Sequence, residues 1–238
     1  MALPQNRQAE PKNTEFLRVR YLRRYCRALQ AKGYNTGELL NEIGLGEQVL
    51  ENPDAWMPQS QLCQFLESAI ATTGYYMLGL DAGIEKRRRH SDFSKLVLYS
   101  PTLFQTLVSI CAHSDREDTS AKFRVVREKN FFWMRCGKVL STPRAVFQFE
   151  TYRYAALLEI IRHAAGAQWL PSIVHFQSDT PERIISSPLL CNVDVKYGSR
   201  ELAIAISPKI MSLPMFDVPD LPMQISRFED IPREFPES

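Results

Sequence analysis

Hydrophobic residues recur at helical spacing in several stretches of the chain. The clearest pattern follows Pro58, a residue suited to the first position of a helix, and places apolar residues at i, i+3, i+4, i+7 and i+8. Its members are Leu62, Phe65, Leu66, Ala69 and Ile70. Similar spacing predicts a helix from Thr14, as its cap, to Gly33, and another that begins at Pro101. A shorter helix is expected around residues 38–43.

The same spacing predicts which side chains face inward. In the first helix the apolar stripe consists of Leu17, Tyr21, Tyr25 and Ala28, which leaves the arginines mostly outside. In the helix after Ser100, which is available as its cap, the inward residues are Leu103, Phe104, Leu107, Val108 and Cys111. A later helix that runs up to Gly166 carries Phe149, Tyr152, Ala156, Ile160 and Ala164 on its apolar positions.

The pattern changes to strands in the second half of the chain. Residues 122–126 and 131–138 are rich in β-branched and aromatic side chains and are separated by a Glu-Lys-Asn turn, so they predict an antiparallel hairpin. Residues 173–177 predict a single strand, and residues 192–197 with 201–206 predict a last hairpin. Because helices come first and strands dominate later, we expect an α+β fold: N-terminal helices followed by a largely antiparallel sheet with a covering helix.

Composition fits one large globular domain or two small ones, with 238 residues of which 45% are hydrophobic and 24% charged. We expect residues 1–13 to be a flexible leader, residues 14–213 the folded domain, and residues 214–238 a proline-rich acidic tail or the stump of a linker. No stretch approaches the ~18 apolar residues of a membrane helix, and the first residues do not resemble a secretion signal. The expected location is therefore the cytoplasm, without a membrane partner.

Charge is distributed unevenly although the formal total is only +2. Residues 1–32 hold eight lysines or arginines and two acids, whereas residues 214–238 hold six acids and two arginines. The near-neutral total disfavours nucleic-acid binding by the chain itself. The basic run at residues 86–89 has no interleaved aromatic residues that could stack on bases, so it is interpreted as a solvated loop.

Motifs of catalysis and metal binding are missing. The sequence has no G-x-S-x-G turn, no phosphate-binding loop and no H-E-x-x-H pair. Cys111 and His113 would point about 200° apart on a helix, and His90, His163 and His175 have no local ligand spacing. Five scattered cysteines without a C-x-x-C pair favour reduced thiols. We therefore predict no metal, no cofactor and no enzymatic activity; the alternative is a small enzyme whose site is assembled from dispersed residues.

Aromatic residues in the second half predict a pocket for a small molecule, because such sites are mostly apolar with a few polar groups. We place it between the late sheet and the helix over residues 149–165. The expected lining is Trp133, Tyr152, Tyr154 and Trp169, with Arg135, Arg153 or His175 as polar anchors. Two-residue alternation puts Trp133 and Arg135 on one face of their strand, while Tyr152 and Tyr154 lie about 200° apart on a helix. The alternative is that these aromatic residues only pack the core.

A series of short patterns adds a family resemblance. A basic helix closed by Ala31-Lys32-Gly33 is followed by residues 39–45, 52–58, 100–103, 169–176 and 191–195. In this order and at these separations the patterns resemble the ligand-sensing N-terminal half of AraC/XylS-type bacterial transcription regulators, the arabinose-binding-like sensor group. The resemblance extends from about Arg23 to Leu213. Two positions depart from it: residues 177–179 lack the expected histidine, and residues 91–94 replace a glycine-rich turn.

The resemblance implies a sensor of an unidentified small-molecule effector that forms a homodimer and reaches DNA only through a separate pair of helix-turn-helix units. No such pair fits after Leu213. We therefore expect the effector-sensing and dimerising domain of an AraC-family regulator without its DNA-binding half. The alternative is a natural stand-alone domain of this kind that acts through protein–protein interaction.

Overall fold

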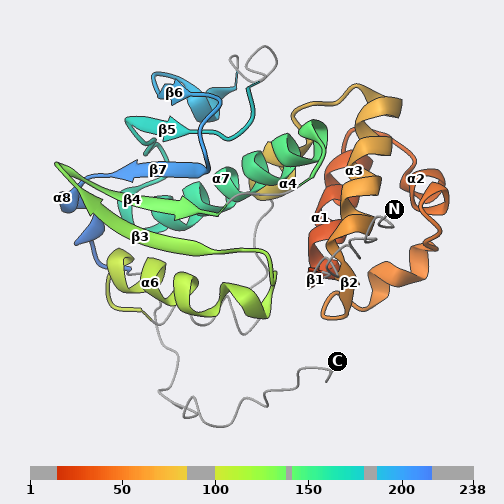
Figure 1. Cartoon of the computed structure of the whole chain (residues 1–238), viewed down its shortest axis with the longest axis horizontal. Helices are drawn as coiled ribbons and strands as arrows, with labels where there is room; N and C mark the ends of the chain where they lie inside the picture. Colours follow the sequence, from red (N-terminus) through yellow and green to blue (C-terminus); the bar gives the residue numbers. More distant parts are fainter. Residues whose placement is uncertain (1–14, 85–99, 138–140, 180–186, 216–238) are drawn as a thin grey trace, which may run out of the picture.

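A helical unit and a five-stranded sheet are joined by one long helix, α7 (Figure 1). The structure is a computed structural model that describes residues 15–84, 100–137, 141–179 and 187–215. The predicted leader with Thr14, the basic run with His90, and the tail from residue 216 lie outside the described residues. The secondary structure is α+β, as predicted.

The helical unit begins with a short strand where a helix was predicted. Its elements are β1 (Phe16–Arg18), α1 (Val19–Gln30), α2 (Thr36–Glu42), η1 (Glu47–Glu51), β2 (Trp56–Pro58), α3 (Gln59–Thr73) and α4 (Leu78–Ile84). The first helix starts at Val19, not near Thr14, because β1 pairs antiparallel with β2. The buried stripe of α1 is consequently Val19, Leu22, Tyr25, Cys26 and Leu29, whereas Tyr21 and Ala28 are only half-buried.

Helix α3 confirms the clearest sequence pattern. All five apolar residues predicted to face inward, from Leu62 to Ile70, are buried. Pro58 was predicted to be the first residue of this helix. In the structure it is the last residue of β2 and therefore the cap that precedes α3. The short helix predicted around residues 38–43 is α2, and Asn35 caps it by accepting a hydrogen bond from the backbone N–H of Gly37 at 3.0 Å.

The second part of the molecule is built around the sheet. Its elements are α6 (Leu103–His113), η2 (Ser114–Arg116), β3 (Phe123–Glu128), β4 (Phe131–Cys136), α7 (Pro143–Ala165), β5 (Ile173–His175), η3 (Pro188–Leu190), β6 (Asp194–Lys196), β7 (Leu202–Ile206) and α8 (Pro208–Met211). The strand order is β3-β4-β7-β5-β6. The first predicted hairpin, β3 with β4, is confirmed, and Lys129 adopts a positive φ of 52° in its turn.

The last predicted hairpin is wrong. Strand β7 pairs antiparallel with β4 and β5, and β6 pairs with β5 in parallel, so the sheet is mixed. The physical reason is the core: Val174 of β5 is fully buried opposite Ile204 of β7, and this packing places β5 where the hairpin partner was expected. The less buried β6 is left at the edge.

Helix α6 differs from its prediction at its start and on its surface. It begins at Leu103, and Thr102 rather than Ser100 caps it by accepting from the backbone N–H of Gln105. Phe104 and Val108, predicted to face inward, are 41% and 43% exposed. Because α6 lies along β3 beside the edge of the sheet, only the stripe of Leu103, Thr106, Leu107 and Ile110 is covered (Figure 1).

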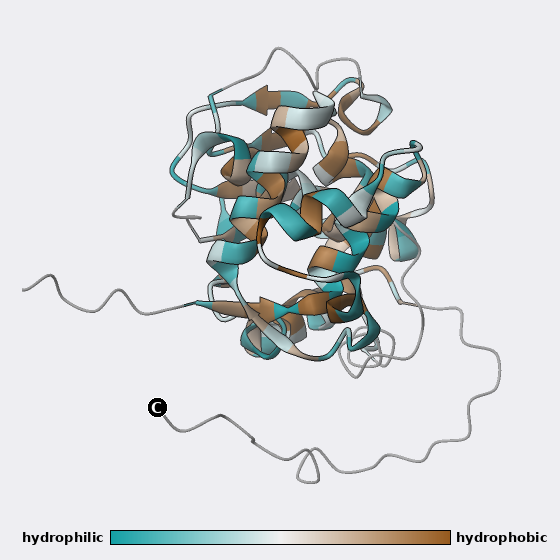
Figure 2. Ribbon diagram, turned by 90° about the vertical axis from the view of Figure 1, so that its right-hand side faces the viewer, coloured by the Kyte–Doolittle hydropathy of each residue, from teal (hydrophilic) through white to brown (hydrophobic). Residues whose placement is uncertain are grey.

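Helix α7 belongs to both hydrophobic cores. Its residues Tyr154 and Leu158 pack in the core under the sheet, whereas Phe149 and Tyr152 pack in the core of the helical unit. Figure 2 shows hydrophobic and hydrophilic residues alternating along the helices that surround these cores. Helix α4 approaches α7 closely through glycine: a Cβ atom at Gly83 would lie 2.6 Å from the carbonyl oxygen of Tyr152. This close contact holds the helical unit against α7, the helix that packs on the sheet.

Candidate functional site

The structure does not bring the predicted pocket residues together between the sheet and α7. Helix α7 covers the face of the sheet that carries Met134 and Ile204, because these residues share a core with it. Trp133 packs on Ala203 and Ala205, which point to the other face. The predicted shared face of Trp133 and Arg135 is present, but it is turned away from the covering helix. Strand alternation fixes which residues share a face and does not fix which face a helix covers.

Trp133, Arg135 and His175 form a cluster on the outer face of the sheet, here called the outer-face cluster. The rings of Trp133 and His175 are 4.8 Å apart, and the guanidinium carbon of Arg135 lies 5.7 Å from the Trp133 ring. Arg135 also bonds Glu128 at 2.8 Å and Glu201 at 3.1 Å. Partial burial, with help from Lys196 and Arg135, lowers the pKa of His175, so its imidazole is neutral at pH 7. Both terminal nitrogens of Arg135 are thus paired, whereas its buried Nε has no partner among the described residues.

Tyr154 and Trp169 are packing residues in this structure. Tyr154 is fully buried, its hydroxyl donates to the carbonyl of Leu189 at 2.6 Å, and its ring meets Phe176 edge-on at 5.6 Å. Trp169 packs against the same core, and its carbonyl accepts from Arg162 at 2.9 Å. As predicted, Tyr152 points away from Tyr154, into the helical unit.

Tyr152 and Arg153 line a cavity at the junction of the two cores, here called the junction cavity. Its volume is about 50 Å³, and it lies between α1, the end of α6 with η2, β3 and α7. The lining residues are Tyr21, Ile110, Ser114, Glu117, Phe123, Tyr152, Arg153, Ala156, Leu157 and Ile160. Of the residues predicted for the pocket, the structure brings only these two neighbours of α7 to the cavity.

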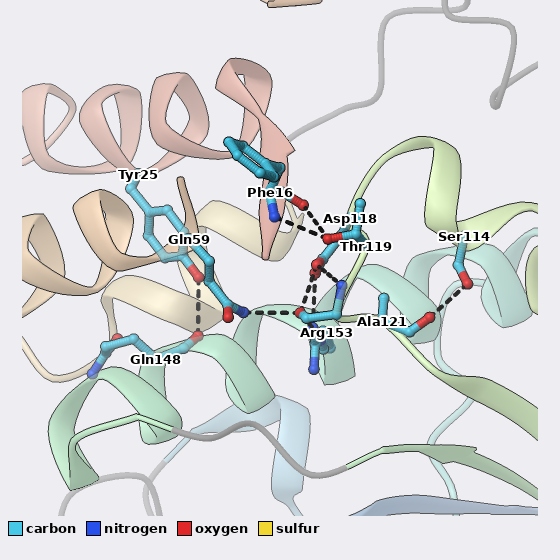
Figure 3. A network of polar contacts seen from close by, with 10 residues as sticks. Phe16, Tyr25, Gln59, Ser114, Asp118, Thr119, Ala121, Gln148 and Arg153 are labelled. Carbon is cyan, nitrogen blue, oxygen red and sulfur yellow. Dashed lines mark hydrogen bonds and ion pairs between the residues drawn. The ribbon is translucent and has the colours of Figure 1, made fainter. Parts of the chain in front are cut away.

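A buried polar network forms one side of this junction (Figure 3). Arg153 is 4% exposed and pairs with Asp118, which is 1% exposed, at 2.8 Å. Asp118 also accepts from the backbone N–H and the hydroxyl of Ser120, at 2.9 and 2.6 Å. Gln59, at the start of α3, donates to the Ser120 hydroxyl at 2.8 Å. A buried ion pair with its remaining lone pairs satisfied is costly to break, because one charge is then left without compensation.

The segment that carries Asp118 also holds the N-terminal strand. The Thr119 backbone N–H donates to the carbonyl of Phe16 at 2.9 Å, and the Arg18 backbone N–H donates to the carbonyl of Glu117 at the same distance. The Glu117 carboxylate pairs with Arg20 of α1 at 3.2 Å. Residues 114–121 therefore contact β1, α1, α3 and α7. This segment connects the helical unit to α7 beside the cavity.

Two tyrosines, Tyr21 and Tyr152, also line the cavity. Their rings are 5.3 Å apart, and the rings of Tyr25 and Tyr152 are 5.4 Å apart. Burial, with the nearby Tyr152, Asp118 and Glu117, raises the pKa of Tyr21, so its hydroxyl stays protonated. Within the part of the chain that the structure describes, neither Tyr21 nor Tyr152 donates a hydrogen bond through its hydroxyl.

A buried carboxylate ties α7 to the loop after β5. Glu150 is 2% exposed and accepts hydrogen bonds from the backbone N–H groups of Gln177 and Ser178, at 2.6 and 3.0 Å, and from the Ser178 hydroxyl. Burial raises the pKa of Glu150 to about 7, although these hydrogen bonds and Arg153 oppose the shift. At residues 177–179, where the resemblance led us to expect a histidine, backbone amides make the polar contact.

The thiols lack the environment of a nucleophile. All five cysteines are free, and burial raises the pKa of Cys26 to about 12 and that of Cys111 to about 11. A catalytic thiol needs the opposite shift. Among the residues the structure describes, no group of three or more His, Cys, Asp and Glu side chains is placed to hold a metal ion. None of the described helices is both long enough and apolar enough to span a membrane.

Sequence reasoning missed Asp118, Ser120, Gln59 and Tyr21 as members of the site. Tyr21 was assigned to an apolar stripe, and the other three are isolated polar residues in a loop or at a helix start. No spacing rule connects residues so far apart in the chain. A weak signal was available in Asp118 and Ser120, since an Asp followed two residues later by Ser favours a local turn bonded by its side chain.

Comparison with known proteins identifies the domain. Residues 33–215 match the family model described as the arabinose-binding domain of AraC transcription regulator, N-terminal. The fold is similar to the crystal structure of the transcriptional regulator CdpR from Pseudomonas aeruginosa, with a TM-score of 0.57 and 11% sequence identity over 88% of this chain. The similar region spans 59% of the CdpR chain. The search of curated proteins found no match.

Proposed function

The chain belongs to the family of N-terminal arabinose-binding domains of AraC transcription regulators, and we propose that it binds a small-molecule effector in the junction cavity. Its role is regulatory and non-enzymatic. The single observation that carries this proposal is the position of the cavity, whose lining comes from α1 on one side and from α6, β3 and α7 on the other. A molecule bound there contacts both cores and favours one arrangement of the junction over others.

The raised pKa values of Cys26 and Cys111 also support a non-enzymatic role, because protonated thiols are poor nucleophiles. The family's name does not identify the effector as arabinose.

A thermal-shift screen of metabolites tests the site. An effector at one hundred times its dissociation constant stabilises the fold by about 2.7 kcal/mol. Ala156→Leu adds three carbon atoms at a residue of the cavity wall that is 4% exposed, so it should remove the stabilisation by filling the space. Trp133→Phe changes the outer-face cluster and should leave the stabilisation intact.

The outer-face cluster is the second candidate position for the effector. The contact between the Trp133 and His175 rings, with Arg135 above the indole, is the observation that favours it. The same pair of variants decides between the positions: stabilisation lost in Trp133→Phe but kept in Ala156→Leu would assign the effector to the outer face of the sheet.

We further propose that the domain forms a homodimer through the outward face of α6. The apolar stripe of α1, from Val19 to Leu29, is buried within the chain, whereas α6 exposes Phe104 and Val108 next to Phe132. Exposed apolar residues grouped in this way are typical of association surfaces. Sedimentation at micromolar concentration should show about twice the monomer mass, and Phe104→Ser/Val108→Ser should return it to the monomer. A double variant that stays dimeric would move the interface elsewhere, with the arginine-bearing side of α1 as the alternative.

We expect no sequence-specific DNA binding by this chain, since its formal charge of +2 supplies little of the phosphate neutralisation that DNA affinity requires. A mobility-shift assay at near-physiological salt measures this, and tight, sequence-dependent binding would contradict it. The alternative role is a stand-alone sensor that acts through a protein partner. A sensor of this kind would also not bind DNA by itself, and it would need no attached DNA-binding unit.

A further inference from the structure

The polar groups around the junction cavity contain an excess of hydrogen-bond donors. Tyr21 and Tyr152 each bring a hydroxyl that donates to no described residue. Arg153 contacts Asp118 and Ser120 through Nη2 alone, and its Nη1 and Nε donate to no residue that the structure describes. Tyr152 is 6% exposed and Arg153 is 4% exposed, yet none of these donor atoms is among the described buried polar atoms that lack a partner, so the donors remain accessible to solvent. A ligand that displaces water from them has to supply an acceptor in its place.

The two carboxylates nearby are already paired with arginines within the protein. Asp118 accepts from Arg153 and twice from Ser120. The Glu117 carboxylate accepts from Arg20 at 3.2 Å. The Ser114 hydroxyl donates to the carbonyl of Ala121 at 2.8 Å, so its proton is not available to a ligand and its oxygen can only accept. The cavity therefore offers donors to a ligand and requires few from it.

Among acceptor groups, a carboxylate matches this set of donors. A guanidinium presents five N–H groups in a planar fork that fits a carboxylate, and Asp118 uses only one of its two terminal nitrogens. The phenol hydroxyls of Tyr21 and Tyr152, which line the same cavity, supply further donors. A neutral acceptor such as an amide gains no charge-assisted hydrogen bond to Arg153, and its N–H groups would compete with Arg20 for the Glu117 carboxylate.

The remaining wall determines the body of the ligand. It is apolar and consists of Ile110, Phe123, Ala156, Leu157 and Ile160. The cavity has a volume of about 50 Å³, and one water molecule requires roughly 10–15 Å³ on the same measure. The cavity therefore holds a group of only a few heavy atoms. A carboxylate on a short apolar chain satisfies both limits, whereas a sugar would bring several hydroxyl donors and a larger ring.

We propose that the effector is a small apolar carboxylic acid whose carboxylate is held by Arg153, Tyr21 and Tyr152. This inference rests on the proposed effector site and adds the chemical class of the effector. The apolar chain lies against Phe123 and Leu157, in contact with both β3 and α7.

The test is a calorimetric titration of the full chain with acetate, propionate and butyrate, each compared with its primary amide at equal ionic strength. We expect the acids to bind and the amides to bind at least tenfold more weakly, with affinity rising from acetate to butyrate. Tyr21→Phe and Tyr152→Phe each remove one hydroxyl without changing the ring, and each should weaken the binding of the acids about tenfold. The control is Tyr34→Phe, whose hydroxyl donates to Thr73 away from the cavity and should leave affinity unchanged.

Equal binding of acids and amides, or acid binding that neither tyrosine substitution changes, would overturn the inference. If no acid binds at millimolar concentration, while the thermal-shift screen yields a ligand whose effect is lost in Ala156→Leu, the carboxylate class is wrong and the proposed site stands. If every ligand found keeps its effect in Ala156→Leu, the proposed site itself fails.

Discussion

The outer-face cluster and the junction cavity contain the same kinds of residues, yet they differ in what they can do. Each places an arginine beside aromatic rings. On the outer face both terminal nitrogens of Arg135 are paired, with Glu128 and Glu201, and all these residues belong to the sheet region. In the junction cavity Arg153 keeps part of its fork unengaged, and the surrounding residues come from both units. Because Arg135 Nε is itself a buried donor without a partner among the described residues, the feature that distinguishes the cavity is that elements of both units meet there.

The largest expected effect contrasts the two arginines. Arg153→Met should destabilise the fold by about 3–5 kcal/mol, because it leaves the carboxylate of Asp118 buried without a counter-charge. Arg135→Met should cost about 1 kcal/mol or less, since Glu128 is 49% exposed to water and Glu201 keeps its ion pair with Arg124. Urea unfolding followed by circular dichroism measures both. Adding Asp118→Asn to Arg153→Met should recover part of the loss; similar costs for the two single variants would remove the contrast.

The next effect concerns pH and the contact that Glu150 makes beside the junction. The pKa of Glu150 is raised to about 7 in the folded protein, so the folded state binds a proton more readily than the unfolded state. The associated stability is present at pH 4.5 and below and is lost as the pH rises through 7, with a total of up to about 3 kcal/mol. Unfolding free energies between pH 4.5 and 8 should show this decline.

Glu150→Gln should flatten the decline, whereas Glu159→Gln, on the same helix but exposed, should not change it. The same slope in all three proteins would show that Glu150 does not titrate in this range. The groups that act on Glu150 are Arg153, which favours its charged form, and Tyr197, whose own pKa is raised by burial and by Glu150.

A smaller effect tests how firmly the helical unit is fixed to α7. Gly83→Ala places a methyl group 2.6 Å from both the Ala155 Cβ atom and the Tyr152 carbonyl oxygen, and backbone there cannot move aside easily. We expect a cost of about 1–3 kcal/mol from overpacking. Gly137→Ala, near the sheet, meets only Lys122 at 3.1 Å and should cost less. Thermal unfolding compares the two variants, and equal costs would mean that the junction tolerates repacking.

Local patterns predicted local structure. The inward residues of α3 and the hairpin of β3 and β4 depend on neighbours a few positions apart, so periodicity was sufficient. The insertion of β5 between β6 and β7 depends on the packing of Val174, which no local pattern shows. Phe104 and Val108 fit a helical stripe, but their exposure is decided by how much of α6 the sheet covers.

The candidate site was predicted only in part for the same reason. Tyr152 and Arg153 were named because they lie on the helix that covers the sheet, and they do line the cavity. Trp133 and His175 were named from strand alternation, which does not determine which of the two faces of the sheet the helix covers. Asp118 reaches Arg153 across 35 positions of the sequence, and only the folded chain shows that the two charges meet.

Hydrogen exchange with and without the effector found by the thermal-shift screen tests the central claim most directly. If the effector binds at the junction, protection should rise in residues 114–121 and at the start of α1, which connect the two units beside the cavity. Protection in β4 around Trp133 should stay the same. Increased protection confined to β4 and β5, with residues 114–121 unchanged, would place the effector on the outer face of the sheet and contradict the account.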